Sequence, residues 1–223
     1  QDEVITLAKS QRRSQTPCDT LWLDIDYMDE YRVFTWNGEL FPDRDLFFKK
    51  LHQLNFKVIT IVDPGVKAED SYAIYDEAHQ KGLLCKCKNG QIYIGQVWPG
   101  DTAFPDFTLA ECRKWWGDLN GDLHKQGIAG IWNDMNEPAT GQISAMDMLF
   151  EGNKEDNSHA RGHNEYGLLM AEATHSGLKK ASPNERPFIL TRAGSAGIQR
   201  YAANWMGDNA SLWSHLEMSL PMA

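Results

Sequence analysis

The sequence contains no apolar run that approaches the roughly 18 residues needed to cross a membrane. It is also poor in cysteine and in positive charge. The four cysteines, Cys18, Cys85, Cys87 and Cys112, have the spacing of neither a zinc cluster nor a dense disulfide framework, so we expect buried free thiols. With 22 Lys and Arg against 31 Asp and Glu, the formal charge of −9 argues against nucleic-acid and anionic-membrane partners and fits a neutral substrate.

The start of the chain lacks the features of a secretory signal. Gln1-Asp2-Glu3-Val4 has neither a basic segment nor an apolar segment, and there is no initiator Met. We therefore expect the sequence to be a piece of a longer protein. The missing signal favours a cytoplasmic location without fixing the compartment.

The chain has no repeats, and strand-like and helix-like segments alternate along it. Continuous apolar runs, typical of parallel strands covered on both faces, occur at 21–25, 57–62, 128–132 and 188–191. Helices are expected at 2–14, 45–54, 108–125 and 165–180, and a hairpin at 83–95 with Asn89-Gly90 at its turn. This order predicts an α/β fold, either an open sheet or a barrel. A nucleotide-binding sheet is disfavoured because no Gly-x-Gly-x-x-Gly or Walker motif is present.

Five segments, the four apolar runs and residues 204–207, lead to an ionisable side chain. The residues at these carboxyl ends are Asp24, Asp63, Asp134, Arg192 and Asp208. A ring of such groups at the carboxyl ends of strands is how barrel enzymes present their active sites, so this pattern favours the barrel.

Paired carboxylates beside aromatic residues are typical of glycoside hydrolysis, in which one acid attacks the anomeric carbon or activates water and the other protonates the leaving oxygen. Trp22, Trp98, Trp132 and Trp205 lie next to the strand-end acids in the sequence. Two alternatives are a metal-dependent glycosyltransferase, suggested by Asp24-Ile25-Asp26, and a non-catalytic sugar-binding module. No His–carboxylate cluster supports the metal, and a binding module needs no pair of acids.

Five sequence blocks resemble glycoside hydrolase family 31, in particular its α-glucosidase branch and its bacterial members. The blocks are Leu21-Trp22-Leu23-Asp24-Ile25-Asp26-Tyr27-Met28-Asp29, Ile61-Val62-Asp63-Pro64-Gly65, Gly95-Gln96-Val97-Trp98-Pro99-Gly100, Trp132-Asn133-Asp134-Met135-Asn136-Glu137, and the region from Arg192-Ala193-Gly194 to Trp205-Met206-Gly207-Asp208-Asn209. The resemblance implies an exo-acting α-glucosidase for malto-oligosaccharides or related α-glucosides, without cofactor or metal, which could form a homo-oligomer at full length. At the nucleophile block the α-xylosidase branch typically has Lys-Thr-Asp-Phe-Gly-Glu, so Met135 and Asn136 point to glucosides. An α-glucan lyase, which shares the covalent intermediate, is a further alternative.

The resemblance also implies a role for individual residues. Asp134 would be the nucleophile that forms a covalent glucosyl intermediate, and Asp208 the general acid and then the general base. Family members retain the anomeric configuration, so the two carboxyl groups should lie roughly 5–5.5 Å apart. The implied substrate-binding residues are Asp24, Ile25, Ile61, Trp98, Trp132, Met135, Arg192 and Trp205. Asp26, Asp63 and Glu137 are expected to orient other side chains, and His124 and His163 have no assigned role.

On this resemblance residues 1–223 are one partial catalytic domain, an incomplete (β/α)8 TIM barrel. Strands 2–6 would be present and strands 1, 7 and 8 missing, as would the family's N-terminal β-sandwich and C-terminal β-domains. An open barrel exposes two sheet edges and an apolar interior. We therefore expect this polypeptide alone to be poorly soluble or inactive.

Overall fold

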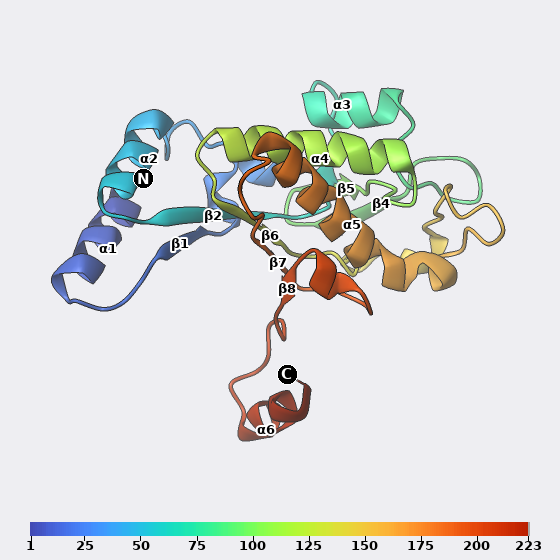
Figure 1. Cartoon of the computed structure of the whole chain (residues 1–223). Helices are drawn as coiled ribbons and strands as arrows, with labels where there is room; N and C mark the ends of the chain where they lie inside the picture. Colours follow the sequence, from blue (N-terminus) through green and yellow to red (C-terminus); the bar gives the residue numbers. More distant parts are fainter. Residues whose placement is uncertain (223) are drawn as a thin grey trace.

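The computed structural model describes residues 1–222, and its main feature is a parallel sheet of five strands in the order β1-β2-β6-β7-β8 (Figure 1). These strands are β1 (Thr20–Leu23), β2 (Lys57–Val62), β6 (Gly130–Asn133), β7 (Ile189–Thr191) and β8 (Ala203–Asn204). They follow one another across the sheet in chain order, as successive βα units of a barrel do. The α/β class and the parallel sheet are therefore confirmed, and the four apolar runs expected as strands lie on β1, β2, β6 and β7, with shifts of up to two residues at the strand ends.

Helices lie between these strands. They are α1 (Asp2–Arg13), α2 (Arg44–Gln53), α3 (Ala73–Gln80), α4 (Ala110–Lys125), α5 (His159–Ala181) and α6 (Trp213–Met222), with short 3₁₀ turns η1 (Ile25–Tyr27), η2 (Asp29–Tyr31), η3 (Ala145–Asp147) and η4 (Ile198–Arg200). Capping decides where two of them begin. Asp43 accepts a hydrogen bond from the backbone N–H of Leu46 at 3.0 Å, and Ser158 accepts one from that of Arg161 at 3.4 Å. The second cap starts α5 six residues earlier than the apolar periodicity predicts.

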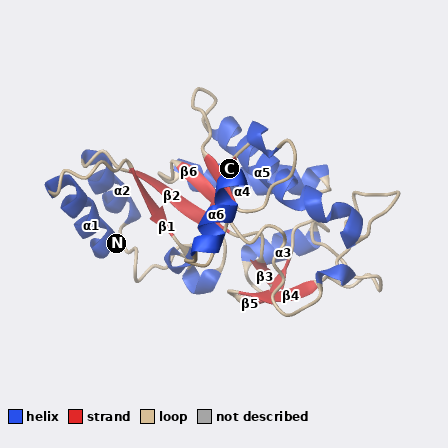
Figure 2. Cartoon of the chain, turned by 90° about the horizontal axis from the view of Figure 1, so that it is seen from below, coloured by secondary structure: helices blue, strands red, loops and turns tan. Residues whose placement is uncertain are grey.

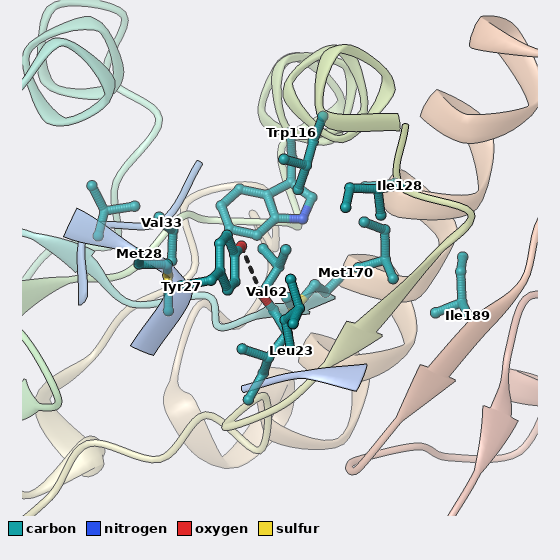
Figure 3. Packing of buried hydrophobic residues seen from close by; sticks show 14 of the residues in the cluster. Leu23, Tyr27, Met28, Val33, Val62, Trp116, Ile128, Met170 and Ile189 are labelled. Atoms are coloured by element: carbon teal, nitrogen blue, oxygen red, sulfur yellow. Dashed lines mark hydrogen bonds between the residues drawn. The ribbon is translucent and has the colours of Figure 1, made fainter. Parts of the chain in front are cut away.

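The core lies between the sheet and the helices that cover its outer face (Figure 3). Along β1 the buried Leu21 and Leu23 face this core, whereas Trp22 between them is 41% exposed on the opposite face. Helices α4 and α5 cross so closely that a Cβ on Gly177 would lie 1.9 Å from the carbonyl oxygen of Gly117. Only glycine, which has no side chain, permits this close approach of the two helices. Trp116 of α4 is fully buried in the core next to this crossing.

The opposite face of the sheet is concave and aromatic. Trp22 of β1 meets Trp132 of β6 edge to face at 6.2 Å, and meets Phe188, just before β7, at 6.1 Å between ring centroids. A flat sheet would separate β1 from β7 by three strand spacings, about 14 Å. The rings converge because the sheet is curled, which is the curvature that a barrel requires.

A second, antiparallel sheet of order β3-β5-β4 is inserted between β2 and α4 (Figure 2). Its strands are β3 (Val66–Lys67), β4 (Ile94–Val97) and β5 (Gly100–Ala103), and sequence reasoning predicted neither it nor α3. The hairpin expected at 83–95 is present: Lys86 and Ile92 form an antiparallel bridge, and Gly90 has a φ of +81° at the turn. The backbone N–H of Gln96 donates to the carbonyl of Thr140 at 3.2 Å, which holds the β4–β5 hairpin against the loop after β6.

The C-terminal helix α6 lies away from the other elements (Figure 1). Its Trp213 is 86% exposed, so the apolar side chains of this helix contribute little to the core of residues 1–222.

No helix among residues 1–222 has the length and apolar character that a membrane span needs. All four cysteines are free; Cys85 and Cys112 are buried as expected, whereas Cys18 and Cys87 are only partly buried.

Candidate active site

Asp134 follows the last residue of β6, at the carboxyl end of the sheet, and is 8% exposed. The chain then turns sharply, and Met135 has a φ of +55°, a conformation that is costly for a residue with a side chain. Asn136 holds this turn: its amide donates to Thr191 Oγ1 at 2.9 Å and its carbonyl oxygen accepts from the N–H of Ala193 at 3.0 Å. Sequence reasoning read Asn136 only as a mark of substrate class; its structural task is to tie the Asp134 turn to β7.

Arg192, at the end of β7, is the centre of the site. Its Nε and Nη2 donate to the two carboxylate oxygens of Glu137 at 2.8 and 2.9 Å, a bidentate pair. Its Nη1 lies 3.0 Å from Asp134 Oδ1, and its Nη2 lies 3.2 Å from the sulfur of Met135. Arg192 therefore lies beside Asp134, and the expectation that Glu137 orients another side chain agrees with this geometry.

Asp208 lies near the same guanidinium nitrogen as Asp134. Arg192 Nη1 lies 3.6 Å from Asp208 Oδ2 as well as 3.0 Å from Asp134 Oδ1. The two carboxylate oxygens cannot be farther apart than these two distances combined, which is compatible with the separation in retaining glycosidases. Their surroundings differ, because the side chain of Asp134 is 12% exposed and that of Asp208 is 90% exposed.

Burial is the main influence on the pKa of Asp134. It raises the pKa of Asp134 above its ordinary value, while the backbone N–H of Met135 and the guanidinium of Arg192 oppose this rise. The pKa of Arg192 is raised, chiefly by its hydrogen bonds to Glu137. The ion pair with Arg192 thus favours the charged form of both partners. For Asp134, however, burial raises the pKa by more than the ion pair lowers it.

Asp24 lies directly after β1, where its Oδ1 accepts a hydrogen bond from the N–H of Ile25 at 2.7 Å. The following segment is anchored to β2, because the buried hydroxyl of Tyr27 donates to the carbonyl of Ile61 at 2.9 Å (Figure 3). Farther on, Arg32 pairs with Glu69 at 2.6 Å. These contacts hold Asp24 and Ile25 at the same edge of the sheet as Asp134.

Asp26 does not orient another side chain among residues 1–222. It is exposed, and within that range its carboxylate takes part in no hydrogen bond or ion pair. The reason is local: the strand has ended at Leu23, and the 3₁₀ turn η1 directs the side chain of Asp26 to solvent. Asp24 and Asp26 therefore do not form a pair of ligands within the strand, and no cluster of three metal-ligating side chains exists in the described part of the chain.

Aromatic side chains border the acids. Trp132 meets Trp205 edge to face at 5.8 Å, and Ile61 is the register partner of Trp132 on the neighbouring strand. Trp98, 54% exposed, lies at the tip of the β4–β5 hairpin. The hairpin that carries Trp98 packs on the loop after β6 through the hydrogen bond between Gln96 and Thr140.

The two histidines without an assigned role have structural contacts. His124 Nδ1 lies 2.6 Å from the carbonyl oxygen of Ile128, and its Nε2 lies 2.9 Å from Ser182 Oγ. His163 pairs with His159 at 2.9 Å on α5.

A cavity of about 920 Å³ opens at the opposite, amino ends of the strands beside Lys57 and Phe188. In barrels that end contributes stability and the carboxyl end carries the chemistry.

Known proteins with similar sequences and structures are glycosidases. The chain is 46% identical to alpha-glucosidase 2 of Bacillus thermoamyloliquefaciens over 225 residues, covering 100% of this chain and 29% of that protein. A crystal structure of the glucosidase II alpha subunit superposes with a TM-score of 0.90 at 37% identity, covering 99% of this chain and 24% of that one. A family 31 dextranase of Flavobacterium johnsoniae superposes with a TM-score of 0.87 at 28% identity, over 99% and 28%. The chain thus spans less than a third of the length of these relatives.

The family model of the glycosyl hydrolases family 31 TIM-barrel domain matches residues 1–223, the whole sequence. The parallel sheet in chain order, its curvature and the strand-end acids agree with that match. The chain belongs to glycosyl hydrolase family 31 and forms part or all of its TIM-barrel domain.

Proposed function

We propose that this chain carries the catalytic residues of a retaining, exo-acting α-glucosidase. In the first step the carboxylate of Asp134 attacks the anomeric carbon of the terminal glucose, and the bond to the leaving oxygen breaks as Asp208 gives that oxygen its proton. In the second step Asp208 removes a proton from water, and the water oxygen displaces Asp134. Two displacements return the sugar to its α configuration, with glucose as product.

A single observation supports this assignment most strongly: one nitrogen of Arg192 contacts both Asp134 and Asp208. Two carboxylates that share a guanidinium face the same small volume. The more buried acid, Asp134, is held by the turn that Asn136 fixes, as a nucleophile must be. The more exposed acid, Asp208, is free to meet the leaving oxygen and then water.

The remaining predicted residues would form the glucose pocket. Asp24 would accept hydrogen bonds from hydroxyls at the non-reducing end, and Arg192 would donate to one. Trp132, Met135 and Trp205, with Ile25, Ile61 and Trp98, would wall the ring, because indole and aliphatic faces suit the C–H faces of sugars. The substrates would be malto-oligosaccharides or related α-glucosides.

We also infer that the five parallel strands are strands 2–6 of the eight-stranded barrel, in one partial catalytic domain. The exposed Trp22 and Phe188 on the concave face support this, because in a closed barrel such residues are covered by the remaining strands. The first residue after each strand would then face a mouth completed by the rest of a longer protein. On this view the polypeptide 1–223 alone is poorly soluble or inactive.

Azide rescue of two variants of the full-length enzyme tests the roles of both acids. With Asp208→Ala and p-nitrophenyl α-glucoside, azide should attack the accumulated covalent intermediate and yield α-glucosyl azide. With Asp134→Gly, azide should take the place of the nucleophile and yield β-glucosyl azide. Identical products from both variants, or near-normal glucose release from maltose by Asp134→Asn, would contradict the assignment. Anhydro-sugar instead of glucose from the wild-type enzyme would indicate an α-glucan lyase, and binding without turnover a sugar-binding module.

A further inference from the structure

Asp63 is a buried acid for which the proposed mechanism has no use. Val62 and Asn133 are register partners on β2 and β6, so the next residues, Asp63 and Asp134, lie side by side at the strand ends. Each comes two residues after a member of the pair Ile61 and Trp132, and side chains two apart share a face. Asp63 therefore lies on the concave face of the sheet next to the proposed nucleophile.

Among residues 1–222, no side chain forms an ion pair with the carboxylate of Asp63. The residue is 4% exposed, and its Oδ1 is buried without a hydrogen-bond partner among residues 1–222. No basic side chain of that range lies within ion-pairing distance of it; the nearby Arg192 is engaged by Glu137 and Asp134. An ionised carboxylate in such a place would lack the compensation that buried charges need.

The charged and titratable groups that act on Asp63 come from four neighbouring elements. Asp134 and Glu137 come from the β6 side, Arg192 from β7, Asp24 from β1, and the hydroxyl of Tyr27 from η1. Arg192 is thus the one cation among these groups, beside the four acids Asp63, Asp134, Glu137 and Asp24, and Tyr27 stays neutral because burial raises its pKa. Burial, and next the charge of Asp134, raise the pKa of Asp63 to about 7. Asp134 has an ion-pair partner in Arg192 and Asp63 has none among residues 1–222, so of these two acids Asp63 holds a proton more readily.

We propose that Asp63 is a positioning residue that works as a neutral carboxylic acid, so that the adjacent Asp134 keeps the negative charge needed for attack on the sugar. The proposal rests on the function proposed above. As a protonated acid, Asp63 adds no repulsion beside Asp134 and supplies an O–H donor on its flank. When Asp63 ionises, a second buried negative charge stands beside the nucleophile, and the arrangement is lost.

The test is the pH dependence of kcat/KM in the full-length enzyme with α-glucosyl fluoride, whose leaving group departs with little need of the Asp208 proton. For the wild-type enzyme we expect kcat/KM to fall at least about fivefold between about pH 6 and about pH 8.5, as Asp63 ionises. Asp63→Asn keeps the shape and a donor but cannot ionise. Its kcat/KM should be lower at about pH 6, by less than about tenfold, and change by less than about twofold over the same range.

Asp63→Leu is the matched control, because it is also uncharged but cannot donate a hydrogen bond. It should lose most activity at every pH while its melting temperature stays near that of Asp63→Asn. A profile of Asp63→Asn that falls as steeply as that of the wild type would overturn the proposal. So would equal activity of the Asn and Leu variants.

Infrared difference spectra between acid and alkaline pH give a second measurement that needs no turnover. The wild-type enzyme should lose a protonated-carboxyl C=O band as the pH rises through about 7, and Asp63→Asn should lack that band. An unchanged band in the variant would overturn the proposal even if the variants were inactive. Turnover by Asp134→Asn would instead contradict the proposed function, while the band would still report on Asp63.

Discussion

Replacing Arg192 is the most informative perturbation of this site, because its guanidinium contacts Asp134, Glu137 and Asp208 together. In Arg192→Met the positive charge disappears while the aliphatic part of the side chain is kept. Arg192 lowers the pKa of Asp134, against the rise caused by burial. Its removal therefore makes Asp134 hold its proton to higher pH, and the acid limb of kcat/KM should move to higher pH.

The size of the effect follows from the burial of the pair. The side chains of Arg192 and Asp134 are 18% and 12% exposed, and their nearest charged atoms are 3.0 Å apart. Removing one partner of a buried ion pair costs about 3–5 kcal/mol, because the other charge stays buried without compensation. Since about 1.4 kcal/mol is a tenfold change in rate, we expect kcat/KM at the optimum to fall by roughly two to three and a half powers of ten.

Arg192→Lys is the control that separates charge from geometry. Lysine keeps a positive charge near Asp134 but cannot form the two-point contact with Glu137. Its kcat/KM should fall by about tenfold or more, with the acid limb close to that of the wild type. The assay is the pH profile of kcat/KM with p-nitrophenyl α-glucoside in the full-length enzyme. Superimposable profiles for the Met and Lys variants, or an unmoved acid limb in Arg192→Met, would refute this account.

Two further predictions concern stability. Gly177→Ala should lower the unfolding free energy by about 2–3 kcal/mol and the melting temperature by several degrees, because its Cβ would meet the Gly117 carbonyl oxygen at 1.9 Å and the helices must separate. The exposed Ser176→Ala on the same helix should be nearly neutral, and equal melting of the two variants would contradict the crossing geometry. For Asp63 the folded pKa, about 7, lies above its ordinary value of 3.8, so the folded state binds the extra proton and the wild type loses stability as pH rises from about 4 to about 7. The loss in unfolding free energy is about 4 kcal/mol in order of magnitude. Urea unfolding of the wild type and of Asp63→Asn at about pH 4.5 and about pH 8 measures it, and the variant should not show the loss. Equal pH dependence of the unfolding free energy in the two proteins would show that Asp63 ionises freely.

Much of the site could be predicted from the sequence, because parallel strands place their carboxyl ends at one edge. Asp24, Asp63, Asp134 and Arg192 each end an apolar run, and the structure brings these runs side by side in chain order. The helices α1, α2 and α4 were predictable for a similar reason, since apolar periodicity and capping residues are local signals. The small β3-β5-β4 sheet was not, because its pairs such as Val66 and Ala103 depend on contacts between distant segments.

What the sequence alone determined is therefore the membership in a family of barrels and the identity of the acids at the strand ends. Only the tertiary structure decided what surrounds each acid. Asp134, Asp63 and Asp26 look alike in the sequence, yet the first is buried beside a cation, the second is buried without one, and the third is exposed. The physical reason is that burial and partner charges come from neighbouring strands. The chemistry of a carboxyl group follows from those neighbours rather than from its position in the chain.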